Sequence, residues 1–200
     1  MRLAALVLGL ILLPVLGAAR PSKPYDKDGA ASGLRNVTVL IVRHAEKPDV
    51  GRGLAPQGGQ RAGAYASYFD PLVLDGNTLL PQRLIATSDS RGSERPRLTL
   101  EPLAAHLQLP IEQPYADKEV AQLVESLRTN NQAAVVLIAW HHGHINDLVT
   151  ALGGNMQALT GNDKWPGDIY NWLIVLRFDE QGQLMTSGSQ LVHEHLLPGD

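Results

Sequence analysis

Two continuous apolar runs in this sequence each end in histidine. Residues 37–42 are β-branched residues and leucine and lead into Arg43-His44, while residues 133–140 lead into His141-His142. Runs of this length and composition are typical of strands that are buried on both faces of a sheet. Because ligands bind outside the carboxyl ends of strands in open α/β sheets, we expect both histidine-bearing ends to face one crevice.

The segments around these runs predict an alternation of strands and helices. Helical spacing is found at 57–69 and 96–107, in the stretch that follows a predicted cap at Asp117, and in the segment that ends near Leu152. Further strands are expected at 84–87 and, as a hairpin around Gly182, at 170–178 and 184–192. The pattern predicts an α/β fold, a three-layer α/β/α sandwich whose mostly parallel central sheet carries an antiparallel C-terminal strand or hairpin.

The chain begins with the layout of a secretory signal peptide. A basic start is followed by an apolar run and a small-residue exit, which predicts a signal peptide at 1–19, a flexible lead-in at 20–35 and a single domain at 36–200. An uncleaved membrane anchor is the alternative. We therefore expect an exported protein, periplasmic or secreted, with no stable membrane span after cleavage. It has no cysteine, and its net charge of −3 gives no reason to expect a nucleic-acid partner.

Several cations are expected near the two histidines. Arg43 precedes His44, and the polar turn that follows the second predicted strand supplies Arg91 and Arg95. Imidazole and guanidinium groups that converge in this way need an anion between them, and the guanidinium fork matches the oxygens of phosphate. A histidine can also attack phosphorus and carry the phosphoryl group. The residues therefore indicate phosphate chemistry.

Four short motifs resemble those of the histidine phosphatase (phosphoglycerate mutase-like) superfamily. They stand in the family's order between about residues 37 and 152, and the similarity is to a phosphatase-type member of the mutase and small-phosphatase branch. The sequence departs from the family pattern at Ala45, where glycine is usual. The motifs are Arg43-His44-Ala45, the segment 54–62, Arg95 four residues before Thr99, and His142-Gly143.

The resemblance implies a covalent phosphatase mechanism that uses neither a metal nor another cofactor. His44 would be the nucleophile, and Arg43, Arg95 and His142 would bind the phosphoryl oxygens. Helix register favours Arg95 over Arg91 for the second arginine. A carboxyl group normally protonates the leaving oxygen; the family often carries it in the segment that holds Asp117 and Glu119, although either residue suits a helix start equally well. The implied partner is a small phosphorylated substrate or a phosphoprotein.

Two other functions are compatible with the sequence. A protein of the same fold that binds a phosphorylated ligand without turnover would keep the arginines, although it would not need an unblocked nucleophile. A metal-dependent hydrolase would use His141, His142 and His144 as ligands, but that hypothesis gives the arginines no task and no His-Glu-x-x-His segment is present.

Overall fold

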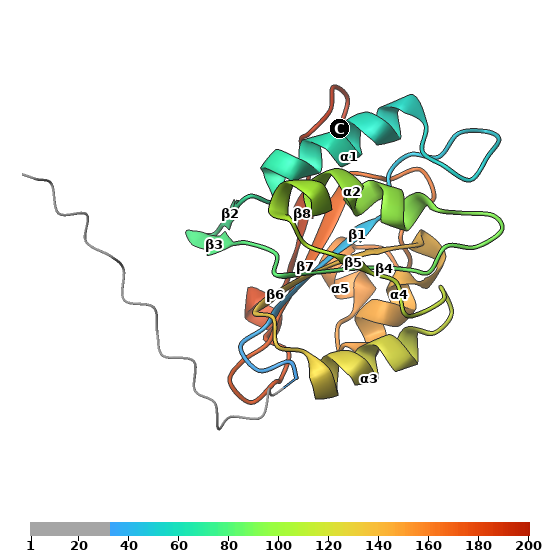
Figure 1. Ribbon diagram of the computed structural model, residues 1–200. Helices are drawn as coiled ribbons and strands as arrows, with labels where there is room; N and C mark the ends of the chain where they lie inside the picture. The colour runs from blue at the N-terminus through green and yellow to red at the C-terminus, as the bar shows by residue number, and fades with distance from the viewer. Residues whose placement is uncertain (1–32) are drawn as a thin grey trace, which may run out of the picture. The chain divides into compact units, whose positions relative to one another are not determined.

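The computed structural model describes residues 33–200 (Figure 1). The predicted signal peptide and most of the predicted lead-in lie outside these residues. At the start of the described chain, Leu34 is buried in the core, and Gly33 packs against the backbone of Arg128. Among residues 33–200, no helix combines the length and the apolar character that crossing a membrane requires.

A mixed six-stranded sheet forms the centre of the fold, in the order β5-β4-β6-β1-β7-β8. Strands β5, β4, β6 and β1 are mutually parallel, whereas β7 runs antiparallel to both β1 and β8. The strands are β1 (Thr38–Arg43), β4 (Arg83–Ala86), β5 (Ile111–Glu112), β6 (Val135–Trp140), β7 (Trp172–Arg177) and β8 (Gln190–His193). The predicted sheet, mostly parallel with an antiparallel C-terminal part, is confirmed.

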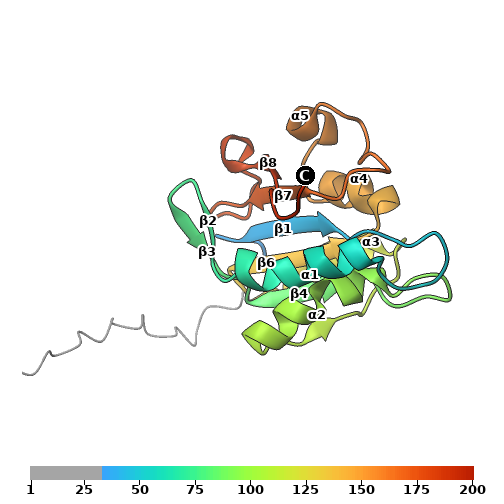
Figure 2. The same ribbon diagram turned by 90° about the horizontal axis from the view of Figure 1, so that it is seen from above.

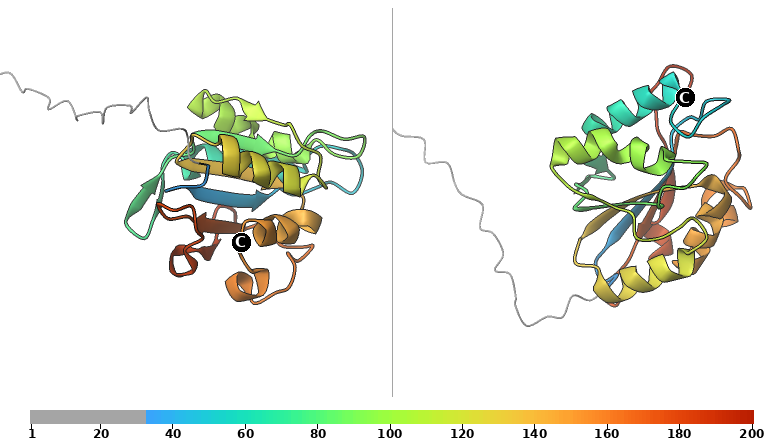
Figure 3. Two further views of the ribbon diagram at one scale, coloured as in Figure 1. Left: turned by 90° about the horizontal axis from the view of Figure 1, so that it is seen from below. Right: turned by 45° about the vertical axis from the view of Figure 1, so that its right-hand side comes forward.

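Helices cover both faces of this sheet, as Figures 1 and 3 show. Helices α1 (Pro56–Tyr68) and α2 (Arg95–Leu107) lie on one face. The opposite face is covered by α3 (Val120–Asn130), α4 (His142–Ala151) and the short α5 (Met156–Thr160). The sandwich predicted from the sequence is therefore present.

The alternation of side chains along the strands divides the core into two clusters. In β1, Val39 and Ile41 pack towards α3, α4 and α5, while Leu40 and Val42 pack towards α1 and α2. Successive residues of a strand point to opposite faces, so a strand covered on both sides needs an apolar residue at every position. All six residues of β1 and all six of β6 are buried. Arg43 is the last residue of β1, and His44 is the first residue after it.

Three local features differ from the sequence-based expectations. A small hairpin of β2 (Leu72–Leu74) and β3 (Asn77–Leu79) turns through Asp75 and Gly76, both with positive φ. The predicted C-terminal hairpin turns at Gly182, but a 3-10 turn, η1 (Thr186–Gly188), delays the start of β8. Helix α3 starts after Glu119, so Asp117 is not its cap. Short turns of this kind depend on a few residues and give weak periodic signals.

Candidate active site

The ends of β1 and β6 lie side by side at the carboxyl edge of the sheet. Arg43 is paired with Trp140 in the parallel register, so the next residues, His44 and His141, leave adjacent strands together. Their ring centroids are 5.0 Å apart in an edge-to-face arrangement. The loops that follow β1 and β4 extend beyond the same edge, as Figure 2 shows. The structure therefore brings the ends of the two histidine-terminated strands together at one edge of the sheet.

His44 is buried and held in one orientation. Its Nδ1 lies 2.7 Å from the carbonyl oxygen of Ala45, which can only accept, so Nδ1 carries the proton and Nε2 has the free lone pair. Burial lowers the pKa of His44 to about 3, and the positive charges of Arg43 and Arg95 and the neighbouring His141 act in the same direction against the Ala45 hydrogen bond. At neutral pH His44 is thus an uncharged imidazole with a defined nucleophilic nitrogen.

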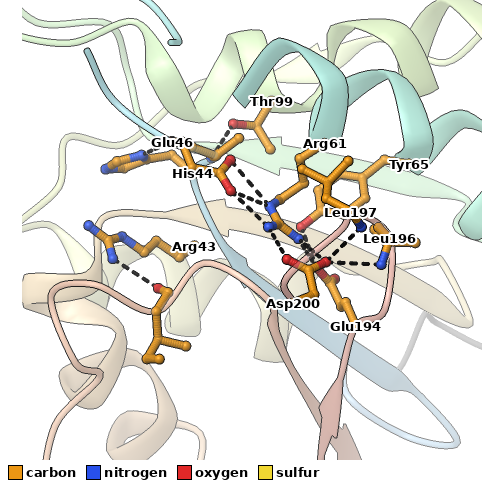
Figure 4. Close-up of polar contacts among 12 residues, drawn as sticks. Arg43, His44, Glu46, Arg61, Tyr65, Thr99, Glu194, Leu196, Leu197 and Asp200 are labelled. Atoms are coloured by element: carbon orange, nitrogen blue, oxygen red, sulfur yellow. Dashed lines mark hydrogen bonds and ion pairs between the residues drawn. The ribbon is translucent and has the colours of Figure 1, made fainter. Parts of the chain in front are cut away.

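Arg43 is anchored by the loop that precedes β7. Its Nη1 donates to the carbonyl oxygens of Gly167 at 2.8 Å and Ile169 at 2.9 Å, and its guanidinium lies 3.8 Å from the ring centroid of Tyr170. Burial lowers its pKa, opposed mainly by Tyr170, yet the group stays charged because a guanidinium keeps its proton in proteins. Its Nε has no protein partner within residues 33–200. Arg43 therefore places a fixed positive charge beside His44, as Figure 4 shows.

Thr99 connects the end of β1 to the start of α2. Its hydroxyl accepts a hydrogen bond from the Ala45 N–H at 2.8 Å and donates one to the Arg95 carbonyl at 2.7 Å. Ala45 and Thr99 are fully covered, whereas Arg95 is partly exposed. This bridge explains the spacing of Arg95 and Thr99, because a threonine one helical turn after the arginine reaches back to its carbonyl while it holds the residue after the nucleophile.

The structure distinguishes the arginines of the polar turn. Arg95 is half-buried, its Nη1 lies 3.3 Å from the carbonyls of Gly51 and Arg52, and its charge acts on Arg43, His44 and His141. Arg91 is exposed at the outside of the turn. Arg97 is held in ion pairs with Asp89 and Glu101. Among these three arginines, Arg95 is therefore the one whose charge acts on His44 and His141.

The three histidines after β6 take different positions. His141 faces His44, and burial followed by the charge of Arg95 lowers its pKa to about 4. His142, the first residue of α4, lies against Gly167, and burial and Arg43 lower its pKa. His144 points to two carboxylates, with Nδ1 2.9 Å from Asp147. Within residues 33–200 no three histidine or acidic side chains are grouped as a metal ion would require.

The electrostatic field at this edge favours an anion. Helices α2 and α4 both begin here, at Arg95 and His142, and a helix N-terminus presents unpaired N–H groups and partial positive charge. The guanidiniums of Arg43 and Arg95 add two full charges. The lowered pKa values of the histidines reflect the same excess of positive charge together with burial. A group with several negatively charged oxygens would offset these positive charges.

The two acidic residues expected as proton donors lie in the loop before α3. The side chain of Glu119 is exposed, and its Oε2 accepts a hydrogen bond from the Ala116 N–H at 2.7 Å. Asp117 is half-buried, and its Oδ2 lies 3.7 Å from Nε2 of His144. Burial raises the pKa of Asp117, with a smaller opposing effect from His144. Within residues 33–200, neither carboxyl forms a hydrogen bond or an ion pair with His44 or Arg43.

A buried ionic cluster supports the loop after the nucleophile. Nη2 of Arg61 donates hydrogen bonds to Oε1 of Glu46 at 2.7 Å and to Oδ1 of Asp200 at 2.6 Å (Figure 4). Glu194 lies beside them, with Oε2 3.0 Å from the Tyr65 hydroxyl and 3.7 Å from Arg61. Helix α1 approaches so closely that a Cβ on Gly58 would lie 2.4 Å from the Glu46 carbonyl oxygen. Glycine at 58 is therefore required by this contact.

Sequence reasoning missed two parts of the site. The loop 166–170 supplies the carbonyls that hold Arg43 and the Tyr170 ring that covers it, although Tyr170 is 127 residues away in sequence. Nothing in the segment Trp165-Pro166-Gly167 indicates which arginine it binds. His141 was interpreted only as a metal ligand in an alternative hypothesis. The register of β6 against β1 is the signal that places it beside His44.

Comparison with solved structures shows what this fold resembles. The structure of the protein histidine phosphatase SixA complexed with tungstate aligns with a TM-score of 0.51 at 20% identity, covering 74% of this chain and 93% of that one. The alpha-ribazole phosphatase from Shigella flexneri aligns with a TM-score of 0.56 at 12% identity over 82% of this chain and 100% of that one. A phosphoserine phosphatase mutant from Entamoeba histolytica, in complex with phosphoserine, gives 0.50 at 12% identity, with 77% and 96% covered.

These structural neighbours are members of the histidine phosphatase superfamily, and the described chain has the fold of that class. No family model matches the sequence. No curated protein matches it either. The likeness is therefore one of fold at low sequence identity.

Proposed function

We propose that this protein is a phosphatase that hydrolyses phosphomonoesters through a phosphohistidine intermediate at His44, without a metal ion. The single observation that carries the proposal is the state of His44. Its Nδ1 is committed to the Ala45 carbonyl, its pKa of about 3 leaves it neutral, and two arginines stand beside it. The fold shared with histidine phosphatases supports the same conclusion.

The first step transfers the phosphoryl group to the protein. Nε2 of His44 attacks phosphorus in line with the leaving oxygen, and the bond from phosphorus to that oxygen breaks. Arg43, Arg95 and His142 bind the non-bridging oxygens and match the charge that develops on them. Loss of one such preorganised donor typically costs about 3–4 kcal/mol of barrier. Water then attacks the phosphohistidine and releases inorganic phosphate.

Fixed geometry is the main contribution of the surrounding residues. The Ala45 N–H is bound to Thr99, and the Ala45 carbonyl is bound to His44, so one residue holds both the imidazole and the start of α2. Arg43 is held through its Nη1 by carbonyls of the loop 166–169. In phosphoryl transfer such positioning and charge stabilisation account for most of the catalysis.

The activity is tested with p-nitrophenyl phosphate in the presence of a chelator, comparing the wild type with His44→Ala. We expect turnover in the wild type, none in the variant, and an acid-labile phosphoenzyme that is absent from His44→Ala. His106→Ala is the matched control, because His106 is exposed and paired with Asp70 at the far end of α2. Equal rates for the wild type and His44→Ala would contradict the mechanism.

A second comparison tests the choice of arginine. Arg95→Met is expected to lower kcat/KM by about a hundredfold or more, in line with loss of a charged donor, whereas exposed Arg91→Met changes it little. Equal losses in the two variants would contradict the assignment of Arg95.

The same assays separate the two alternative functions. A chelator-sensitive activity would favour a metal-dependent hydrolase. Binding of inorganic phosphate with no turnover of any phosphomonoester would favour a phospho-ligand-binding protein. We propose small phosphorylated molecules or phosphoproteins as substrates, because phosphate is the part of the substrate that the site recognises.

Export is proposed from residues 1–19 alone. Expression of the full chain and of a chain that starts at residue 20, followed by fractionation, tests it. We expect the full chain in the exported fraction and the shortened one in the cytoplasm, and the same fraction for both would contradict export.

A further inference from the structure

His141 is the titratable side chain that faces the proposed nucleophile most directly. Its ring centroid lies 5.0 Å from that of His44 with the planes at 70°, while the Tyr170 ring lies at 6.3 Å. The position is fixed by the backbone, because His141 follows Trp140 and the parallel register sets Trp140 beside Arg43. A residue placed by two adjacent core strands is held more rigidly than one placed by a surface loop.

The carboxyl groups near the site have other partners or lie elsewhere. Glu46 is bound to Arg61, and Glu119 is bound to the Ala116 N–H. Asp117, in the loop before α3, lies 3.7 Å from Nε2 of His144 in α4. Asp168 is exposed in the loop that holds Arg43, where its charge acts on that arginine. Within residues 33–200, none of these carboxyls forms a hydrogen bond or an ion pair with His44.

The charges around His141 suit a group that gains a proton when phosphate binds. In the free protein the pKa of His141 is lowered to about 4, first by burial and then by Arg95, His142, Arg43 and His144. An anion bound between Arg43 and Arg95 would offset those positive charges and favour the imidazolium. A bound phosphate thus favours a proton on His141 in the complex, where the leaving oxygen needs one.

We propose that His141 gives its proton to the leaving oxygen of the substrate and then takes a proton from the attacking water. The inference rests on the proposed phosphatase function. In the first step the bond between phosphorus and the leaving oxygen breaks, its electron pair goes to that oxygen, and the oxygen takes the proton of the His141 imidazolium. In the second step the water oxygen bonds to phosphorus, a water proton passes to His141, and the bond between His44 and phosphorus breaks.

The proton that starts the cycle comes from solvent as substrate binds, and the second step restores it. General acid catalysis of this kind typically contributes about 10²–10⁴-fold. Its size depends on the leaving group. An alkoxide is a poor leaving group and needs the proton, whereas p-nitrophenolate is a stable anion and leaves without it.

The test compares two substrates in His141→Gln, p-nitrophenyl phosphate and glycerol phosphate. We expect kcat/KM for glycerol phosphate to fall by about a hundredfold or more, and kcat/KM for p-nitrophenyl phosphate to change by less than about tenfold. The phosphoenzyme should still form from p-nitrophenyl phosphate, which shows that the variant is folded. Added imidazole should partly restore glycerol phosphate hydrolysis in His141→Gly.

Matched controls are Asp117→Asn, Glu119→Gln and Asp168→Asn, each of which should affect both substrates equally. An equal loss for both substrates in His141→Gln would overturn the proposal and leave His141 as a phosphate ligand. A loss specific to glycerol phosphate in a carboxyl variant would overturn it as well. If the wild type forms no phosphoenzyme from p-nitrophenyl phosphate, the phosphatase function itself fails, which is a different outcome.

Discussion

The buried carboxyl of Glu194 should make the stability of this protein depend on pH in a way that one substitution removes. The side chain is fully covered, Oε1 has no partner within residues 33–200, and Arg61 is already bound to Glu46 and Asp200. Burial raises the pKa of Glu194 to about 8, although the Tyr65 hydroxyl and Arg61 act in the opposite direction. The folded protein therefore holds this carboxyl in its neutral form at neutral pH.

The sign of the effect follows from proton binding. Between the usual pKa of 4.5 and about 8, the folded protein keeps a proton that the unfolded chain has released. The free energy of unfolding then falls as pH rises. The contribution of Glu194 is fully present below about pH 4.5 and is lost progressively as the pH rises to about 8. At 1.36 kcal/mol for each tenfold change in proton affinity, the loss reaches about 5 kcal/mol.

Glu194→Gln has no proton to lose and keeps nearly the same shape. We expect its free energy of unfolding, relative to that of the wild type, to rise by several kcal/mol between pH 4 and pH 9. Urea denaturation at a series of pH values measures this difference and cancels the titration of other groups. Glu180→Gln, at an exposed position, is the control. A difference between Glu194→Gln and the wild type that does not change with pH would refute the reasoning.

Three further predictions concern the positioning of the site. Thr99→Val leaves the buried Ala45 N–H unpaired; it should cost about 1–3 kcal/mol of stability by urea denaturation and lower kcat. Gly58→Ala should lower the melting temperature, because its Cβ would lie 2.4 Å from the Glu46 carbonyl; an unchanged melting temperature would refute the contact. Because the pKa of His44 is about 3, rapid-quench phosphorylation by p-nitrophenyl phosphate should persist at pH 5, and a loss centred near 6.5 would contradict a neutral buried nucleophile.

Local sequence patterns were sufficient for most of the fold. The apolar runs before His44 and His141 predicted β1 and β6 to within a few residues, and the helical spacing after Pro96 predicted α2. These elements follow from periodicity and burial, which neighbouring residues encode. The β2–β3 hairpin and α5 were missed because each is only a few residues long.

Parts of the candidate site were also visible in the sequence. The end of the first apolar run pointed to Arg43 and His44, and the spacing of Arg95 and Thr99 reflects one helical turn. The partners of these residues were not visible. Glu46 and Lys47 had no assigned role, and only the folded chain shows that Glu46 is bound to Arg61.

By itself, the sequence determined which residues end the central strands and which chemistry they carry. The tertiary structure decided that Tyr170 covers Arg43, that Arg95 rather than Arg91 faces the histidines, and that His141 lies against His44. The physical reason is the range of the interactions involved. Strand and helix preferences act between near neighbours in the chain, whereas the direction of a side chain at the site is set by strand register and by loops more than a hundred residues away.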